Sequence, residues 1–486
     1  MPDGLNKSPM TKHFTFFLFT LTALCYFSCK EKKVSATAPV LSENKTEVHT
    51  PLPSQKQDTL KTGVTTKVTC LAFASESYAV YLPASYSKSK ALPVIYFFDP
   101  HADGSLPLEN YKSLAEEFHF VFVGCNNSKN GMSFEQTQAV AGRMMADVTN
   151  RFYVHEQWQY VAGFSGGSKV ACNLAIVNPS IKGLIACSGS YANNAQPFSA
   201  SLNVASLAGE KDFNYFEMVR FHEIVSVTNA ALFISTNNKH EWPPVTAMRE
   251  ALLFMHIKKV EGDKKSDEVK ALETAFKKEM AKASALEKKG NIYNACQQYK
   301  NSISIFKNTL DVSLSIEKVK SLEKNPLFEA YENKKQNLEN QEQKAQQYYA
   351  EAFQTKDINW WNNDIAKTKT ASEDSSDPLW AAYNSRMMGF FGIISYSYCT
   401  QAVKANAAQA EKLLAIYKSC APEIDEANFL SAVYAANNGK TDVAITELKA
   451  AIQKGFHDKS RIISYPALSA IVSNSSELKM LLDAIH

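Results

Sequence analysis

The chain contains 486 residues, more than one ordinary domain holds, so we expect two or three separate hydrophobic cores. Its apolar fraction of 45% and charged fraction of 21% are those of a globular protein. A formal net charge of +3 is close to balance, which argues against a nucleic-acid partner.

The first residues have the pattern of an export signal. Lys12 and His13 precede an apolar run at 14–27, which is too short for a stable membrane span and fits the apolar region of a signal peptide. The run ends at Ser28-Cys29, and a small residue before a cysteine at this place resembles a bacterial lipoprotein lipobox. The resemblance implies that Cys29 becomes the lipidated N-terminus of an exported cell-envelope lipoprotein, periplasmic or associated with the outer membrane. A plain cleaved signal peptide and an uncleaved anchor are the alternatives.

We therefore divide the chain into four parts. Residues 1–29 form the expected lipoprotein signal peptide, and the polar residues 30–63 form a disordered tether. Residues 64–257 and 258–486 form the two folded parts. Acylation of Cys29 with two or more chains would anchor the protein stably to a membrane.

Seven cysteines lie beyond the export segment. They are widely scattered and odd in number, with neither CxxC pairs nor metal-type spacing. We expect no metal site and no cofactor, and we interpret most of these cysteines as small buried apolar residues. The sequence leaves open whether a pair such as Cys399 and Cys420 forms a disulfide.

Short apolar runs alternate with amphipathic segments in the first folded part. Two antiparallel strands are expected first, and the full set of predicted strands is 64–72, 77–82, 93–98, 120–124, 159–162, 183–186, 203–208 and 231–235. Helices are expected between them, including 111–118, 133–152 and 168–175. Continuous apolar runs separated by helices indicate an α/β fold with a mostly parallel sheet covered on both faces. In such a sheet the functional site lies at the carboxyl ends of the strands.

The most informative part of the chain is the segment Gly163-Phe164-Ser165-Gly166-Gly167. It lies between a predicted strand and a predicted helix, which is the context of the G-x-S-x-G nucleophile elbow. The sharp turn strains the backbone at Ser165 and requires small flanking residues. The Ser165 hydroxyl would then project above the sheet, and the Gly166 N–H could donate to a developing oxyanion.

A serine hydroxyl needs an imidazole held by a carboxylate to become a good nucleophile. In the elbow architecture the acid and then the histidine follow the serine along the chain. Asp212 follows an apolar strand and a Gly turn, with Glu210 as the second choice, and His240 lies in a loop after the last predicted strand. The intervals are 47 residues from Ser165 to Asp212 and 28 from Asp212 to His240. Each interval holds one strand-helix unit, so we expect the three side chains to meet at one edge of the sheet.

These residues resemble the α/β-hydrolase family, in particular its small esterases and phospholipase/carboxylesterase-like members. The resemblance covers about residues 64–257. It implies an acyl-enzyme mechanism in which Ser165 attacks a carbonyl, His240 acts as base and then acid, and Asp212 fixes the imidazole tautomer.

The resemblance also implies a second oxyanion donor in the loop after the strand at 93–98. Many relatives have His-Gly in that loop, whereas this chain has Asp99-Pro100. Because Pro100 has no N–H, we expect the backbone N–H of His101 to be the donor.

The strands stop after about residue 257. Residues 258–324 are charged and helical by periodicity, and further helices are expected at 328–353, 379–398, 406–417, 426–437 and 441–453, with a loop at 367–378. Two windows resemble tetratricopeptide repeats. One is 290–303, with Ala295, Tyr299 and Ile303 at packing positions, and the other begins at Gly439. The windows are irregularly spaced, so we interpret this part as a degenerate helical repeat array.

Each candidate site residue also has a structural interpretation. Ser165 could belong to a hydrolase-like domain that only binds, Asp212 could cap the next helix, and His240 could be an ordinary surface histidine. The residues 126–128 could line the cleft or form a turn. Trp242 could wall an acyl pocket or simply pack.

Two functions fit these patterns. The first is a lipid-anchored serine esterase of the cell envelope. Only 24 residues lie between Cys187 and Asp212, which leaves no room for a helical lid. The open cleft that this implies favours a bulky or polymeric ester, such as a feruloyl, acetyl-sugar or peptide-type acyl substrate. A small ester also fits. The second is an envelope scaffold in which the hydrolase domain is inactive and the helical part binds a protein or a glycan.

Overall fold

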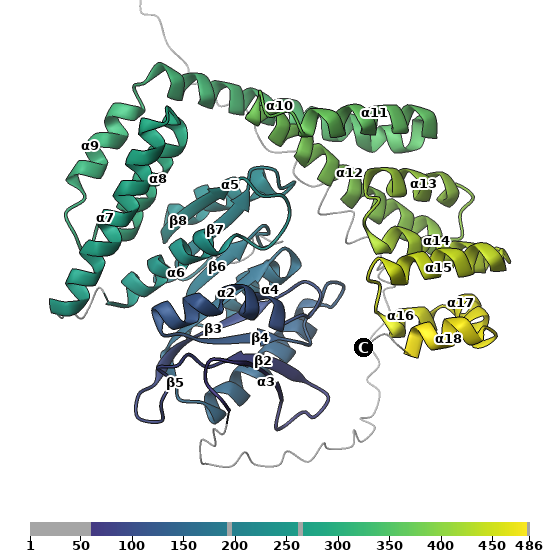
Figure 1. Ribbon diagram of the computed structural model, residues 1–486, viewed down its shortest axis with the longest axis horizontal. Coiled ribbons are helices and arrows are strands. Elements are labelled where there is room, and N and C mark those ends of the chain that lie inside the picture. The colour runs from purple at the N-terminus through teal and green to yellow at the C-terminus, as the bar shows by residue number, and fades with distance from the viewer. Residues whose placement is uncertain (1–59, 192–196, 261–265, 484–486) are drawn as a thin grey trace, which may run out of the picture.

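The computed structural model describes residues 60–191, 197–260 and 266–483 (Figure 1). The predicted signal peptide with Cys29, and most of the expected tether, lie outside these ranges. Among the described helices, none is both long enough and apolar enough to span a membrane.

An eight-stranded sheet forms the first part of the molecule, with strand order β1-β2-β4-β3-β5-β6-β7-β8. Strand β2 pairs antiparallel with β1 and β4, and the other neighbours run parallel. The strands are β1 (Thr65–Thr69), β2 (Ser77–Tyr81), β3 (Leu92–Phe98), β4 (Val121–Cys125), β5 (Val154–Phe164), β6 (Ile181–Cys187), β7 (Asn203–Gly209) and β8 (Ala230–Thr236). The predicted mostly parallel sheet is confirmed, and β5 is longer than predicted.

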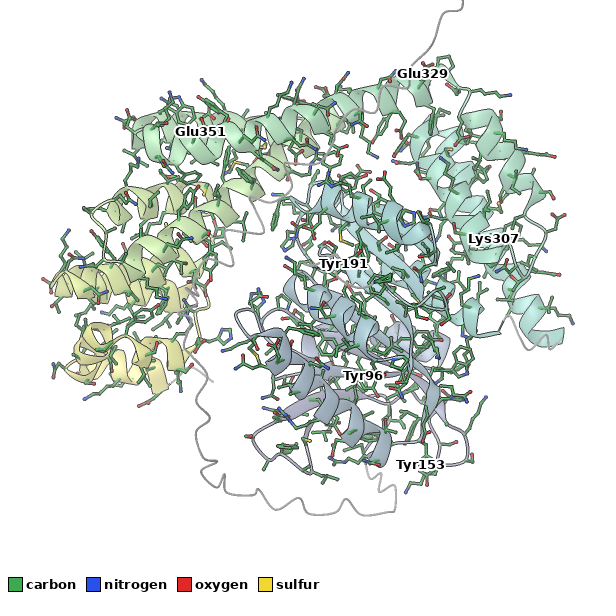
Figure 2. All side chains as sticks on the ribbon, turned by 180° about the vertical axis from the view of Figure 1, so that it is seen from behind. Tyr96, Tyr153, Tyr191, Lys307, Glu329 and Glu351 are labelled. Atoms are coloured by element: carbon green, nitrogen blue, oxygen red, sulfur yellow. The ribbon has the colours of Figure 1, made fainter. Side chains whose placement is uncertain are left out.

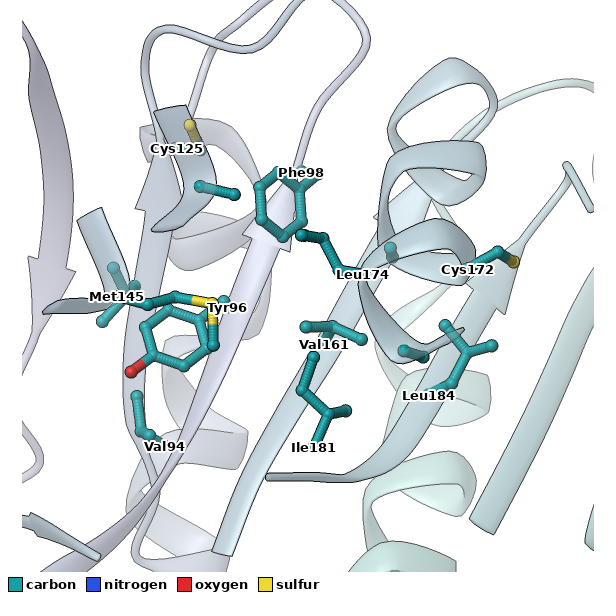
Figure 3. Close-up of a cluster of buried hydrophobic side chains, with 14 of the residues drawn as sticks. Val94, Tyr96, Phe98, Cys125, Met145, Val161, Cys172, Leu174, Ile181 and Leu184 are labelled. Carbon is teal, nitrogen blue, oxygen red and sulfur yellow. The ribbon is translucent and has the colours of Figure 1, made fainter. Parts of the chain in front are cut away.

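Both faces of the central strand β3 are buried, which explains its uninterrupted apolar sequence. Tyr96 and Phe98 enter the core on one face, and Ile95 and Phe97 enter the core on the other. The first face is covered by α3 (Phe134–Arg151), α4 (Gly166–Val177) and α5 (Tyr215–Ser226). Figure 3 shows part of this core, where Leu174 of α4 lies near Phe98. The second face is covered by α2 (Ser105–Phe118) and α6 (Val245–Val260).

Helices make up the rest of the described chain. They are α7 (Ser266–Lys288), α8 (Ile292–Phe306), α9 (Ser313–Leu322), α10 (Pro326–Thr355), α11 (Ile358–Ser372), α12 (Pro378–Lys404), α13 (Ala410–Cys420), α14 (Asp425–Asn437), α15 (Thr441–Gln453), α16 (Lys459–Ser464), α17 (Pro466–Ser473) and α18 (Ser476–Asp483). The predicted fold class, an α/β-hydrolase-type sheet followed by an all-helical part, is therefore confirmed.

The helical part reaches around the sheet from one side to the other. Ile305 and Phe306 of α8 join the core on the second face of the sheet. The long helix α10 then crosses beside the sheet, as the positions of Glu329 and Glu351 near its two ends show in the reverse view (Figure 2). The helices α12 to α18 lie beyond it and form a separate hydrophobic core with the end of α10 and with α11 (Figure 1).

The predicted loop at 367–378 is wrong in its first half, because α11 continues to Ser372. Asp357 caps the start of α11 by accepting a hydrogen bond from the Trp360 N–H at 2.9 Å. Trp361, Ile365 and Thr368 are buried with the spacing of one helix face. Lys367, Lys369 and Thr370, which suggested a loop, lie on the solvent side of this helix.

Both windows that suggested helical repeats form helix hairpins. The α7–α8 turn contains Gly290 with φ +74°, and the α14–α15 turn contains Gly439 with φ +69°. These left-handed conformations explain the glycines. The packing positions Ala295 and Tyr299 of α8 are buried, as is Ala444 of α15.

All cysteines of the described chain are buried and free. Cys399 and Cys420 therefore do not form the disulfide that the sequence left open. Burial raises the pKa of both thiols, which favours their protonated, unreactive form.

Candidate active site

Ser165 lies in the turn between β5 and α4 and has a strained backbone. Its φ of 54° and ψ of −119° fall outside the regions that non-glycine residues normally occupy. Such a conformation costs of the order of 1–3 kcal/mol and persists only where the surroundings impose it. The Ser165 N–H donates to the Cys187 carbonyl at 2.9 Å, which ties the turn to the end of β6.

The glycines of the segment allow this turn to pack closely. A Cβ atom on Gly167 would overlap the Phe98 carbonyl at the end of β3, and a Cβ on Gly163 would overlap the Gly167 carbonyl. Any side chain at these two positions would push α4 away from the sheet. The glycine requirement predicted from the sequence thus has a steric cause.

Ser165, His240 and Asp212 come together at the carboxyl ends of β5, β8 and β7. The Ser165 Oγ lies 2.9 Å from His240 Nε2, and His240 Nδ1 lies 2.9 Å from Asp212 Oδ1. If Nδ1 carries the proton and donates it to the carboxylate, Nε2 is free to accept the Ser165 hydroxyl proton. The arrangement can therefore remove a proton from Ser165 as that hydroxyl attacks an electrophile.

The surroundings hold the imidazole and the carboxylate in place. His240 lies against two aromatic rings, with centroid distances of 4.8 Å to Phe164 and 4.3 Å to Phe213. Its side chain is 23% exposed, so one edge remains accessible, whereas Asp212 is fully buried. Asp212 Oδ1 also accepts a hydrogen bond from the Asn214 N–H at 2.8 Å. Asp212 Oδ2 has no hydrogen-bond partner among the described residues.

Glu210, the second choice for the acid, does not contact His240. Its carboxylate accepts a hydrogen bond from the Ser235 hydroxyl at 3.1 Å. Burial raises the pKa of the Glu210 carboxyl, against the opposing influence of Ser235. Asp212 is thus the carboxylate that the structure pairs with the imidazole.

His101 does not offer the free oxyanion donor that we expected from the sequence. Its backbone N–H donates to Asp99 Oδ1 at 2.8 Å. Trp242 Nε1 donates to the other carboxylate oxygen, Oδ2, at 2.8 Å. Burial alone would raise the pKa of Asp99, but the hydrogen bonds from His101 and Trp242 outweigh it and lower that pKa. The buried Asp99 carboxylate therefore accepts the His101 N–H, which the sequence predicts to be an oxyanion donor.

Gly166 remains suitable as an oxyanion donor. It is the first residue of α4, where a backbone N–H has no carbonyl partner within the helix. The positive end of the helix dipole adds to the attraction for an anion at this point.

Asn130 is a site residue that the sequence did not reveal. The loops after β3 and β4 pair with each other through a bridge between His101 and Lys129, and the Asn130 N–H donates to the Pro100 carbonyl at 2.8 Å. This pairing brings the exposed Asn130 amide, with its Oδ1 atom foremost, against the Cα of Gly166. No local pattern marks Asn130, because its position depends on two loops meeting.

The neighbouring residues 126–128 support the loop. Asn126 Oδ1 accepts from the Gly104 N–H at 3.0 Å, and Asn127 Oδ1 accepts from the Ser77 N–H at 2.7 Å. Trp242 packs against the rings of Phe97, Tyr111 and Phe164, in addition to its bond with Asp99. These contacts fit a turn at residues 126–128 and a packing role for Trp242.

Within the described ranges, no group of three or more His, Cys, Asp or Glu side chains is arranged to hold a metal ion.

No family model and no curated protein matches this sequence. Among solved structures, the chain is similar to a hyperthermophilic esterase from the archaeon Pyrobaculum calidifontis, at 15% identity over 41% of this chain and 85% of that chain, with a TM-score of 0.32. It is also similar to a feruloyl esterase module from Clostridium thermocellum, at 13% identity over 47% of this chain and 94% of that chain, with a TM-score of 0.31. A thermophilic carboxylesterase from a metagenomic library gives 14% identity, 41% and 87% coverage, and a TM-score of 0.33. At identities and TM-scores this low, the likeness to these structures says nothing about the activity of this chain.

Proposed function

We propose that this chain is a serine hydrolase that cleaves carboxylic esters by transferring the acyl group to water. The observation that carries the proposal is the hydrogen-bonded line from Ser165 Oγ through His240 to the buried Asp212, with 2.9 Å at each step. The strained backbone at Ser165 supports it, because strain of this kind is retained at functional sites.

The reaction would proceed in two halves. Ser165 Oγ attacks the ester carbonyl carbon while His240 Nε2 takes the hydroxyl proton, and the carbonyl oxygen becomes an oxyanion. The C–O bond to the alcohol then breaks, and His240 returns the proton to the leaving alkoxide. A water molecule repeats the sequence on the acyl-Ser165 ester and releases the acid. Asp212 stabilises the imidazolium in both halves.

The oxyanion would receive hydrogen bonds from the Gly166 N–H and from a second donor. Asn130 is the candidate, because its amide lies beside Gly166. Its Oδ1 atom is the one nearest Gly166, and rotation of this exposed amide about the Cβ–Cγ bond would present the NH₂ group there instead.

We expect Asn130→Ala to lower kcat for a short ester by roughly 10²-fold, because one oxyanion donor is removed. KM should change little, since the charge on the oxygen develops only in the transition state. Steady-state kinetics on p-nitrophenyl acetate measure both quantities. An unchanged kcat would show that Asn130 does not serve the oxyanion.

The described residues around the site suit a large substrate. Between β6 and β7, residues 188–191 and 197–202 form no helix that could cover Ser165. Without a helix from these residues over Ser165, a bulky or polymeric ester could reach the hydroxyl as well as a small one. Together with the lipoprotein-like signal ending at Cys29, this access supports an enzyme that acts on such an ester at the cell envelope.

The helix hairpins at Gly290 and Gly439 support a second role for the tetratricopeptide-like part, as a surface for a protein or glycan partner. In the alternative function this would be the main role, and the hydrolase part would be inactive.

Turnover of short p-nitrophenyl esters by the full chain tests the proposed function. We expect saturable hydrolysis at neutral pH that rises in proportion to protein concentration. A rate no higher than that of buffer, across acetate, butyrate, feruloyl and acetylated-glycan esters, would favour the scaffold.

A further inference from the structure

The turn that carries Asp212 lies between the sheet and α12 of the helical part. We propose that α12 positions the Asp212–His240 pair, so that the helical part completes the active site. This inference rests on the proposed function and adds to it a role for residues that are distant in the sequence. Three independent contacts carry it.

The first two contacts are hydrogen bonds from α12 to the backbone of the turn. Its N–H groups bond within the α/β part: Glu210 N–H donates to Thr236, Lys211 N–H to Asn238, and Asp212 N–H to Gly209. Among the described residues, the carbonyls of Glu210 and Lys211 accept no backbone hydrogen bond within the α/β part. They accept hydrogen bonds from α12, from Arg386 Nη1 at 2.5 Å and from the Ser385 hydroxyl at 3.3 Å.

The donor Arg386 is itself fixed. Its guanidinium donates to the Glu342 carboxylate of α10 at 2.8 Å, and both side chains are buried. It also lies over the Phe216 ring, 4.7 Å from the centroid. A buried guanidinium held by the Glu342 carboxylate and the Phe216 ring has little freedom to move, so its remaining N–H fixes the position of the Glu210 carbonyl.

The third contact leads directly to the imidazole. Gly389 of α12 lies so close to Phe213 that a Cβ on Gly389 would be 2.8 Å from Phe213 Cδ1 and 3.3 Å from its Cβ. Phe213 follows Asp212 and packs against His240, with the two rings tilted by 34° and their centroids 4.3 Å apart. The lack of a side chain at Gly389 therefore leaves the room that Phe213 needs to hold His240.

The same helix provides a matched control. Gly392 lies one turn further along α12, and a Cβ there would meet nothing within 4 Å. Alanine at either position replaces a glycine inside a helix, so the two changes have the same effect on helix propensity. Only alanine at 389 forces the Phe213 ring to move.

Kinetics of Gly389→Ala and Gly392→Ala in the full chain, with p-nitrophenyl acetate as the probe, test the proposal. We expect kcat of Gly389→Ala to fall by about 10–100-fold with KM nearly unchanged, since small displacements of catalytic groups have effects of this size. Gly392→Ala should keep the wild-type kcat and unfold at the same or a higher temperature. Equal kcat for both variants and the wild type would overturn the proposal.

Two further variants keep the test decisive if Gly389→Ala folds poorly. Ser385→Ala removes the hydrogen bond to the Lys211 carbonyl without adding any atom, and we expect a several-fold loss of kcat at unchanged KM. In a Phe213→Leu background, Gly389→Ala should cause little additional loss, because the shared ring is gone. Full additivity of the two changes would contradict coupling through Phe213. An inactive wild type and an inactive Gly392→Ala together would refute the proposed function itself, whereas active proteins that are all alike would refute only the role of α12.

Discussion

Ser165→Ala is expected to abolish ester hydrolysis, with kcat lower by on the order of 10⁶-fold. The substitution removes the only atom that attacks the carbonyl, and His240 then has no hydroxyl proton to accept. The fold should persist, because alanine keeps the Cβ and the Ser165 N–H bond to Cys187 is a backbone contact. Steady-state kinetics with p-nitrophenyl butyrate measure the loss, and the thermal unfolding midpoint checks the fold.

A glycine at the same position separates catalysis from strain. Ser165→Gly should be as inactive as the alanine variant but more stable, because glycine adopts a positive φ without penalty. Continued turnover in either variant would mean that another residue attacks the ester. That result would eliminate the acyl-serine mechanism.

Asp212→Asn is expected to reduce kcat by on the order of 10⁴-fold while leaving the fold intact. An amide has no negative charge to stabilise the imidazolium, and it no longer enforces the tautomer in which His240 Nε2 accepts the Ser165 proton. The amide oxygen can still accept the Asn214 N–H, so the turn should keep its shape. The pre-steady-state rate of acyl-enzyme formation measures the effect on the first half of the reaction.

Glu210→Gln is the matched control for this prediction. Glu210 lies in the same turn, is half-buried, and bonds to Ser235 rather than to His240. Its backbone carbonyl, which Arg386 holds, is unaffected by the change. We expect kcat to stay within a few-fold of the wild-type value. A loss as large as that of Asp212→Asn would show that the two carboxyl groups were assigned the wrong way round.

The residues of the candidate triad could be found from the sequence because each has a local signal. The glycines around Ser165 mark a turn that no other residue type fits, and the predicted strands place Asp212 and His240 at strand ends. Parallel strands bring these ends to one edge of a sheet, so three distant points of the chain meet without further information. The sheet was predictable for a similar reason, since buried parallel strands are continuous apolar runs.

The oxyanion donors were not predictable in the same way. Which backbone N–H groups are free depends on the rotamers of nearby carboxylate side chains. Here the Asp99 carboxylate accepts the hydrogen bond of the His101 N–H. Asn130 approaches Gly166 only because the loops after β3 and β4 pair with each other. Neither event leaves a pattern in the residues close to it.

Contacts between the α/β part and the helical part could not be predicted from the sequence either. Periodicity predicted the helix that became α12, but it did not indicate what each face would touch. The hydrogen bonds from Arg386 to Glu210 and from Ser385 to Lys211 join residues 176 and 174 positions apart. Within the helical part, the error at 367–372 arose because Lys367, Lys369 and Thr370 occupy the exposed side of α11.

Covalent labelling of the full chain with a fluorophosphonate probe tests the central claim most directly, because only an activated serine displaces fluoride from phosphorus. The account predicts one adduct per chain, placed on Ser165 by mass spectrometry of its peptide, and no adduct after heat denaturation. A protein that stays unlabelled while folded, or that carries the adduct on another residue, would contradict the proposed hydrolase.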